Sequence, residues 1–131
     1  MSGERKRVLV VEDNRAMAKV LAFNLQRAGF DVDVALNPRS ALELLSSKKF
    51  DFILTDYQMP QMSGEEFVRC LRADQRYIDI PVLMCTAKGY EFDTEGLMKE
   101  LGIIRFLFKP FSPQEIVNIV RTTLEPSSTT V

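Results

Sequence analysis

The chain has 131 residues, of which 17 are Lys or Arg and 18 are Asp or Glu, so its formal net charge is −1. This length suits a single domain, and a near-neutral chain lacks the basic excess that nucleic-acid binding requires. The sequence contains no His, which excludes a His-containing catalytic triad and a His-ligated zinc site on this chain. Its hydrophobic content of 46% and charged content of 27% are typical of a globular domain rather than a disordered chain.

The cysteines and the N-terminal segment indicate the compartment. Cys70 and Cys85 form neither a C-x-x-C pair nor a disulfide framework, and we expect both to lie reduced on core-facing positions. The apolar run Val8–Val11 is shorter than the about 7–15 residues of a secretory signal, and no window approaches the roughly 20 apolar residues of a membrane span. We therefore expect a cytoplasmic protein without membrane association.

Five short apolar segments alternate along the chain with five segments in which apolar residues recur at helical spacing. Most of the short segments are continuously apolar, as is typical of strands that are buried on both faces of a parallel sheet. They comprise residues Val8–Val11, Val32–Ala35, Phe52–Thr55, Pro81–Cys85 and Phe106–Phe108. This alternation predicts a doubly wound α/β domain over residues 1–125, with residues 126–131 as a flexible tail or the start of a linker.

The helical segments are marked by capping residues and by apolar spacing. Ser63 with Glu66, and Ser112 with Glu115, match the capping box and predict where the third and fifth helices begin. The fourth segment, Gly89–Leu101, is the least helix-like because Gly89 and Gly96 both oppose helix formation. The core-facing residues expected in the first helix are Met17, Val20, Leu21, Leu25 and Ala28.

Polar residues directly follow four of the five predicted strands. Glu12 and Asp13 follow the first strand, and Asp56 follows the third. Thr86 follows the fourth and Lys109 the fifth. Open α/β sheets bind ligands beyond the carboxyl ends of their strands, so these side chains are expected at one rim. Each residue alone has an ordinary explanation as a cap, a turn residue or a solvated charge, but their coincidence favours a functional site.

Three carboxylates at one rim call for a cation. Two like charges about 4 Å apart repel by about 4 kcal/mol at an effective dielectric constant near 20. Oxygen ligands without His or thiolate favour a hard ion, and Mg²⁺ suits an open site that is shared with a phosphoryl group. Mg²⁺ and Lys109 together supply +3 against the −3 of Glu12, Asp13 and Asp56, which predicts a phosphoryl-transfer site.

The combined pattern resembles the receiver domains of two-component response regulators, and its size and layout are similar to those of chemotaxis response regulators. This resemblance implies a flavodoxin-like fold, with a five-stranded parallel sheet of order 2-1-3-4-5 and five helices. The segments that carry it are Val10-Val11-Glu12-Asp13-Asn14, Leu54-Thr55-Asp56-Tyr57-Gln58-Met59-Pro60, Thr86-Ala87 and Lys109-Pro110-Phe111.

The resemblance also implies a role for each acidic residue. Asp56 would be the phosphoacceptor, taking a phosphoryl group from a histidine kinase or a histidine phosphotransfer domain. Asp13, Asp56 and the backbone carbonyl of Gln58 would bind Mg²⁺ directly, while Glu12 would act largely through water. Such a protein is a signalling switch rather than a turnover enzyme, limited to phosphotransfer and autodephosphorylation.

A second group of residues is implied to respond to the phosphoryl group. Lys109 and Thr86 would each bond one phosphoryl oxygen, and the Lys109-Pro110 peptide bond is expected to be cis. Inward movement of Thr86 would open space into which the ring of Phe106 rotates. This would remodel the surface of the fourth helix, fifth strand and fifth helix, where a downstream protein or output domain would bind. The residues implied to tune the lifetime of the acyl phosphate are Gln58 and Lys88.

Two departures from the family pattern leave alternatives open. Phe106 stands where family members often carry Tyr, so no phenol is available for a surface hydrogen bond. Ile103 and Ile104 replace a usually polar segment, and they predict either ordinary packing or a hydrophobic docking patch. The stretch from Leu101 to Leu107 is also similar to receivers attached to hybrid histidine kinases. The sequence leaves open the cognate kinase, the oligomeric state and whether the domain stands alone.

Two other classes compete with the signalling switch. A haloacid-dehalogenase-like phosphohydrolase also forms an aspartyl-phosphate, but its nucleophile is usually followed two residues later by an acid, where this chain has Gln58. A flavodoxin-like carrier of FMN would have a phosphate-binding loop after the first strand. Here the acidic pair Glu12-Asp13 would repel the phosphate of FMN.

Overall fold

The computed structural model describes residues 5–87 and 93–125, and within them strands and helices alternate from the first element to the last. The strands are β1 (Arg7–Val11), β2 (Asp31–Ala35), β3 (Phe52–Asp56), β4 (Val82–Thr86) and β5 (Ile103–Phe108). The helices are α1 (Arg15–Arg27), α2 (Pro38–Ser47), α3 (Gly64–Arg72), α4 (Thr94–Leu101) and α5 (Pro113–Leu124). None of these helices is long and apolar enough to cross a bilayer.

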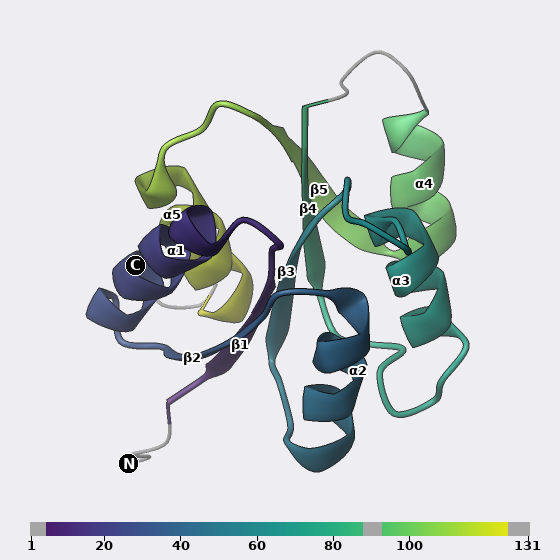
Figure 1. Ribbon diagram of the computed structural model, residues 1–131, viewed down its shortest axis with the longest axis horizontal. Coiled ribbons are helices and arrows are strands. Elements are labelled where there is room, and N and C mark those ends of the chain that lie inside the picture. The colour runs from purple at the N-terminus through teal and green to yellow at the C-terminus, as the bar shows by residue number, and fades with distance from the viewer. Residues whose placement is uncertain (1–4, 88–92, 126–131) are drawn as a thin grey trace.

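The strands form one parallel sheet in the order β2-β1-β3-β4-β5, which confirms the predicted fold. Helices α1 and α5 cover one face of the sheet, and α2, α3 and α4 cover the other (Figure 1). Every residue of the inner strands β3 and β4 is buried, since both of their faces lie under helices. This explains why their sequences are apolar throughout rather than alternating.

Successive residues of β3 contribute to the two separate cores. Ile53 packs with Phe67 of α3 on one face, whereas Leu54 packs with Ile116 of α5 on the other. All four side chains are at most 2% exposed. Burying each of them removes enough apolar surface to favour folding by about 1.5–3 kcal/mol. Packing in the two cores therefore fixes the position of β3 along its own axis, and with it the position of Asp56 at its carboxyl end.

Strand β5 begins three residues earlier than predicted. Ile103 is buried in the core beneath α3 and α4, and Ile104 packs against the core beneath α1 and α5. The packing interpretation is therefore confirmed for Ile103, whereas Ile104 is half-buried, so a docking patch at Ile104 stays a prediction. The pairing of β4 with β5 shifts by one residue at Val82, and this irregularity leaves Ile104 between two paired positions.

The predicted capping boxes are present at the starts of α3 and α5. Helix α4 begins at Thr94 with Asp93 as its N-cap, and the part of the predicted fourth helix before Asp93 includes residues outside the described ranges. The predicted tail, residues 126–131, also lies outside them.

Two predictions about core-facing residues are wrong. Cys70 is exposed, because α3 turns Phe67, Val68 and Leu71 toward the sheet and leaves position 70 on its outer side. Val20 of α1 is 44% exposed, since α1 presents only a narrow face to the sheet. Cys85, in contrast, is buried as predicted.

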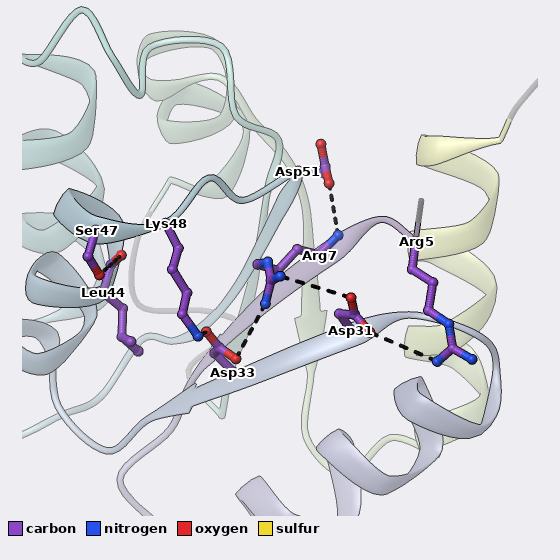
Figure 2. Close-up of polar contacts among 8 residues, drawn as sticks. All are labelled: Arg5, Arg7, Asp31, Asp33, Leu44, Ser47, Lys48 and Asp51. Carbon is purple, nitrogen blue, oxygen red and sulfur yellow. Dashed lines mark hydrogen bonds and ion pairs between the residues drawn. The ribbon is translucent and has the colours of Figure 1, made fainter. Parts of the chain in front are cut away.

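A network of charged side chains ties the amino ends of β1 and β2 to the end of α2 (Figure 2). Arg7 reaches from β1 across β2, where its guanidinium lies 4.0 Å from Asp31 and 3.8 Å from Asp33. Lys48 closes the network with a 2.7 Å ion pair to Asp33. The network lies at the amino ends of the strands, and the polar rim residues lie at their carboxyl ends. It therefore contributes to stability at a distance from the candidate site.

Candidate functional site

The acidic residues meet where two neighbouring strands end. Asp56 is the last residue of β3, and Glu12 and Asp13 follow β1, which pairs with β3 so that Val11 lies beside Thr55. One carboxylate oxygen from each acid lies within 4.8 Å of the others. Glu12 and Asp56 are only 4% and 5% exposed, while Asp13 is open to solvent. The structure thus combines two buried carboxylates with one exposed carboxylate in a single cluster.

Lys109 contributes the positive charge of the cluster. It follows β5, which is separated from β3 by β4, and its side chain reaches past the end of β4 to Asp56. Its Nζ lies 2.8 Å from the Oδ1 atom of Asp56. Oδ1 is buried, and no hydrogen bond from residues 5–87 or 93–125 reaches it beside this ion pair. The Lys109-Pro110 peptide bond is cis.

Thr86 and Phe106 lie on the neighbouring strands β4 and β5. Thr86 is 1% exposed, and its carbonyl accepts a hydrogen bond from the backbone N–H of Lys109 at 2.9 Å. The ring of Phe106 is already buried, at 7% exposure, in the core that it shares with Leu97 and Met98 of α4. The rotation of this ring that the sequence led us to expect stays a prediction. A phenylalanine ring has no hydroxyl to keep in water, so burying it removes apolar surface without a polar cost.

Burial and the neighbouring charges determine how the clustered groups ionise. Burial raises the pKa of Glu12, and the nearby charge of Asp56 raises it further. Burial also raises the pKa of Asp56, and the ion pair with Lys109 opposes this effect without cancelling it. Burial alone would lower the pKa of Lys109, but the hydrogen bond and charge of Asp56 raise it above its ordinary value. Holding three carboxylates together therefore costs free energy in the absence of a cation.

Cys85 is the thiol nearest to the cluster, and it is not a nucleophile. Burial raises the pKa of Cys85 far above its ordinary value, and the charge of Asp56 raises it further. Since the thiolate is the reactive form, the buried thiol of Cys85 stays inert at neutral pH.

Gly64 is a positioning residue that sequence reasoning missed. A Cβ atom at Gly64 would lie 2.5 Å from the carbonyl oxygen of Asp56 and 2.7 Å from the Sδ atom of Met84. Its N–H donates a 2.7 Å hydrogen bond to the carbonyl of Tyr57. The absence of a side chain lets α3 begin directly against the end of β3. The sequence feature that could have indicated this role is a glycine directly after the N-cap Ser63.

The donor set fits a hard divalent cation. The three carboxylates of Glu12, Asp13 and Asp56 carry −3 and Lys109 carries +1, so the cluster has a net charge of −2. Oxygen donors of this kind suit Mg²⁺, and the exposed Asp13 leaves the site open to water and to a phosphoryl group. Gln58 is exposed on the segment after β3, and Lys88 lies outside the described ranges.

Two mainly apolar surface hollows lie beside α1 in the described part of the chain. One, of about 360 Å³, adjoins the rim and is lined by residues that include Met17, Val20 and Phe111. A larger groove of about 690 Å³ lies between α1 and the edge strand β2, with Phe23 and Val34 in its lining. None of the three clustered acids lines the larger groove, so the candidate site does not coincide with the larger of these two hollows.

The fold and the acidic rim define a flavodoxin-like α/β domain with a cluster of carboxylates at the carboxyl end of its sheet. Residues 8–121 match the family model described as the response regulator receiver domain, and the chain belongs to that family. Receiver domains are the signalling switches of two-component systems.

Sequence relatives include transcriptional regulators of phosphate metabolism. The chain is 38% identical to the alkaline phosphatase synthesis transcriptional regulatory protein PhoP of Bacillus subtilis, over 93% of this chain and 50% of the relative. It is 37% identical to the phosphate regulon transcriptional regulatory protein PhoB of Pseudomonas aeruginosa, over 91% of this chain and 52% of the relative. The chain therefore spans about half the length of these relatives.

Solved structures of receiver proteins superpose on the whole domain. The chemotaxis response regulator CheY4 of Vibrio cholerae is 31% identical, with a TM-score of 0.82 over 90% of this chain and 98% of that chain. The receiver domain of a sensor histidine kinase from Pseudomonas aeruginosa is 26% identical, with a TM-score of 0.79 over 90% of this chain and 96% of that chain. That structure has a magnesium ion coordinated in its active-site cleft.

Proposed function

We propose that the chain is cytoplasmic and accepts a phosphoryl group on Asp56 from the phosphohistidine of a histidine kinase or histidine phosphotransfer domain. The observation that carries this proposal is the buried carboxylate of Asp56, with the ammonium of Lys109 2.8 Å away and two more carboxylates within 4.8 Å. A carboxylate oxygen attacks phosphorus, the phosphorus–nitrogen bond of the donor breaks, and its electron pair returns to the imidazole. The product is an acyl phosphate on Asp56.

The acids around Asp56 are suited to hold the Mg²⁺ that this reaction needs. Asp13, Asp56 and the backbone carbonyl of Gln58 would bind the ion directly, and Glu12 would bind it through water. Bound Mg²⁺ would neutralise the charge that develops on the phosphoryl oxygens. The net charge of −2 on the cluster supports this assignment, because a divalent cation balances it.

Two further side chains would bind the transferred group. The ammonium of Lys109 now pairs with Asp56 and would bond a phosphoryl oxygen after transfer, while the hydroxyl of Thr86 would bond another. Gln58 and Lys88 would tune the lifetime of the acyl phosphate. The signal would leave through the surface formed by α4, β5 and α5, where a hollow of about 350 Å³ lined in part by Ile104 and Ile119 offers apolar area to a downstream protein or output domain.

The phosphodonor would dock on the apolar hollow between α1 and the segment that follows Lys109. This hollow is lined by Met17, Val20 and Phe111 among others, and Val20 is 44% exposed. Since Asn14 and Phe111 in its lining are close in sequence to Asp13 and Lys109, a helix seated there would lie beside the reacting carboxylate.

Incubation with acetyl phosphate and Mg²⁺, followed by intact mass spectrometry, tests the proposal. We expect one alkali-labile phosphoryl group in the native protein and none in Asp56→Asn. Asp74→Asn is the matched control, because Asp74 is a surface acid that pairs with Arg76 away from the rim, and it should be labelled as the native protein is. Release of phosphate over many cycles would instead favour a phosphohydrolase, and a bound yellow chromophore would favour a flavin carrier.

A second variant separates the docking surface from the chemistry. Val20→Asp places a charge in the proposed docking hollow without touching the acids, and we expect slower transfer from a phosphorylated histidine phosphotransfer domain. Labelling by acetyl phosphate should be unchanged, because that donor needs no protein surface. Equal loss with both donors would show that the substitution disturbs the site itself.

A further inference from the structure

Helix α4 is held to the domain mainly at its C-terminal end. Leu101 is its one fully buried residue, whereas α3 buries Gly64, Phe67, Val68 and Leu71. The other residues of α4 are half-buried or exposed. Segments with few buried apolar contacts open more readily than the core, so the first turn of α4 is weakly held by packing.

Arg72 of α3 binds the backbone where α4 ends. Its Nε donates to the carbonyl of Leu101 at 2.6 Å, and its Nη2 donates to the carbonyl of Gly102 at 3.3 Å. Its Nη1 donates to the carbonyl of Tyr77 at 2.9 Å, in the segment that leads to β4. Gly102 adopts a left-handed conformation with a φ of 68° and ends the helix. One guanidinium thus joins three segments at the C-terminal end of α4.

Arg69, one turn earlier on α3, adds a side-chain link to the same end of α4. Its guanidinium makes two bonds to the carboxylate of Glu100, at 2.6 and 3.2 Å. It also bonds Glu65 within α3, at 2.9 Å. The hydrogen bonds from Arg69 lower the pKa of Glu100, so this carboxylate stays ionised at neutral pH. The fork-like geometry fixes the direction of the Glu100 side chain as well as its charge.

Within residues 5–87 and 93–125, the N-terminal end of α4 makes fewer polar contacts than its C-terminal end. Among the described residues, its cap is the bond from the N–H of Gly96 to the exposed carboxylate of Asp93, at 2.9 Å. Phe106 packs in the core with Leu97 and Met98 of α4, so a displacement of the N-terminal half of α4 would change what covers this ring.

We propose that Arg69 and Arg72 anchor the C-terminal end of α4 to α3, so that α4 responds to phosphorylation only in its N-terminal half. The anchor is a property of the unmodified domain, and its effect on signalling rests on the proposed phosphorylation of Asp56. A helix fixed at Gly102 can change position only by turning about that end. The displacement is then largest near Asp93, on the side of the rim, and smallest beside α3.

Residue-resolved amide hydrogen exchange on the unmodified protein tests the anchor. We expect the amides of Leu101 and Gly102 to exchange about two- to fivefold faster in Glu100→Gln, as for the loss of one exposed ion pair. We expect at least about tenfold faster exchange in Arg72→Met, which removes bonds to carbonyls from a partly buried cation. Glu65→Gln is the matched control, since it removes a partner of Arg69 within α3 and leaves the link to Glu100. Unchanged exchange in both test variants would overturn the anchor.

The same measurement after phosphorylation tests the confinement of the response. In the native protein, acetyl phosphate with Mg²⁺ should change exchange at Gly96 and Leu97 and leave Leu101 and Gly102 unchanged. In Glu100→Gln the change should spread to the C-terminal amides. A uniform change along α4 of the native protein would refute the proposal. Failure to gain a phosphoryl group by mass would refute the proposed function, and the exchange of the unmodified variants would still decide the anchor.

Discussion

Replacing Glu12 by Gln should stabilise the protein in the absence of divalent cations. Glu12 is 4% exposed and has carboxylate oxygens of Asp13 and Asp56 within 4.8 Å. A repulsion over 4.8 Å is worth about 3 kcal/mol at an effective dielectric constant near 20 and about 1 kcal/mol in water. The attraction to Lys109 offsets roughly one of the two repulsions. We therefore expect the free energy of unfolding to rise by about 1–3 kcal/mol.

The pH dependence of this gain has a definite sign. The pKa of Glu12 in the folded protein is raised above its ordinary value of 4.5, first by burial and then by Asp56. The folded state therefore holds this proton more tightly than the unfolded state, and the native protein loses stability as pH rises through the raised pKa. Below pH 4.5, the ordinary pKa, Glu12→Gln should give no gain in stability. The gain should grow between that pH and the raised pKa of the folded protein, and it should be complete at higher pH.

Urea and thermal unfolding of both proteins, with EDTA and with Mg²⁺ and over a range of pH, give the measurement. Each kcal/mol should raise the melting temperature by about 4 °C for a chain of this length. Mg²⁺ should stabilise the native protein more than the variant, because the ion neutralises the same repulsion. Glu43→Gln, at an exposed position of α2, is the control and should change stability by less than about 0.5 kcal/mol. A variant less stable than the native protein at neutral pH in EDTA would refute the reasoning.

Three other substitutions test the packing and the charges. Gly64→Ala should lower the free energy of unfolding by about 1–3 kcal/mol, because the new Cβ would meet backbone and the buried Met84 sulfur. Gly96→Ala is the comparison and should cost less, because its Cβ meets only a side chain that can rotate. Urea unfolding of both variants gives the measurement. Lys109→Met should destabilise the protein by about 1–3 kcal/mol at neutral pH, because it leaves the buried carboxylate of Asp56 unpaired. Adding Asp56→Asn to this variant should restore stability. Failure of that rescue would contradict the ion-pair explanation. Lys48→Met, in the exposed network of Figure 2, should cost less than about 1 kcal/mol, and the loss should shrink at high salt when melting temperatures are compared.

The sequence determined the layout of this protein because its strands are short, apolar and regularly interrupted by helices. In a parallel sheet, all strands end at the same edge. Identifying where β1, β3 and β5 end was therefore enough to predict that Glu12, Asp56 and Lys109 share one rim. Predicting that charged residues lie at the ends of these strands required no knowledge of how the helices pack.

Tertiary structure decided which residues face inward and which distant residues meet. Cys70 was expected on a core-facing position, but the packing of α3 on the sheet leaves its side chain exposed. The ring of Phe106 is buried because α4 and the sheet enclose it, and its own segment does not show that α4 is the neighbour. The bonds from Arg69 to Glu100 join positions 31 residues apart. Sequence periods describe one element at a time, whereas burial and ion pairs depend on which elements become neighbours.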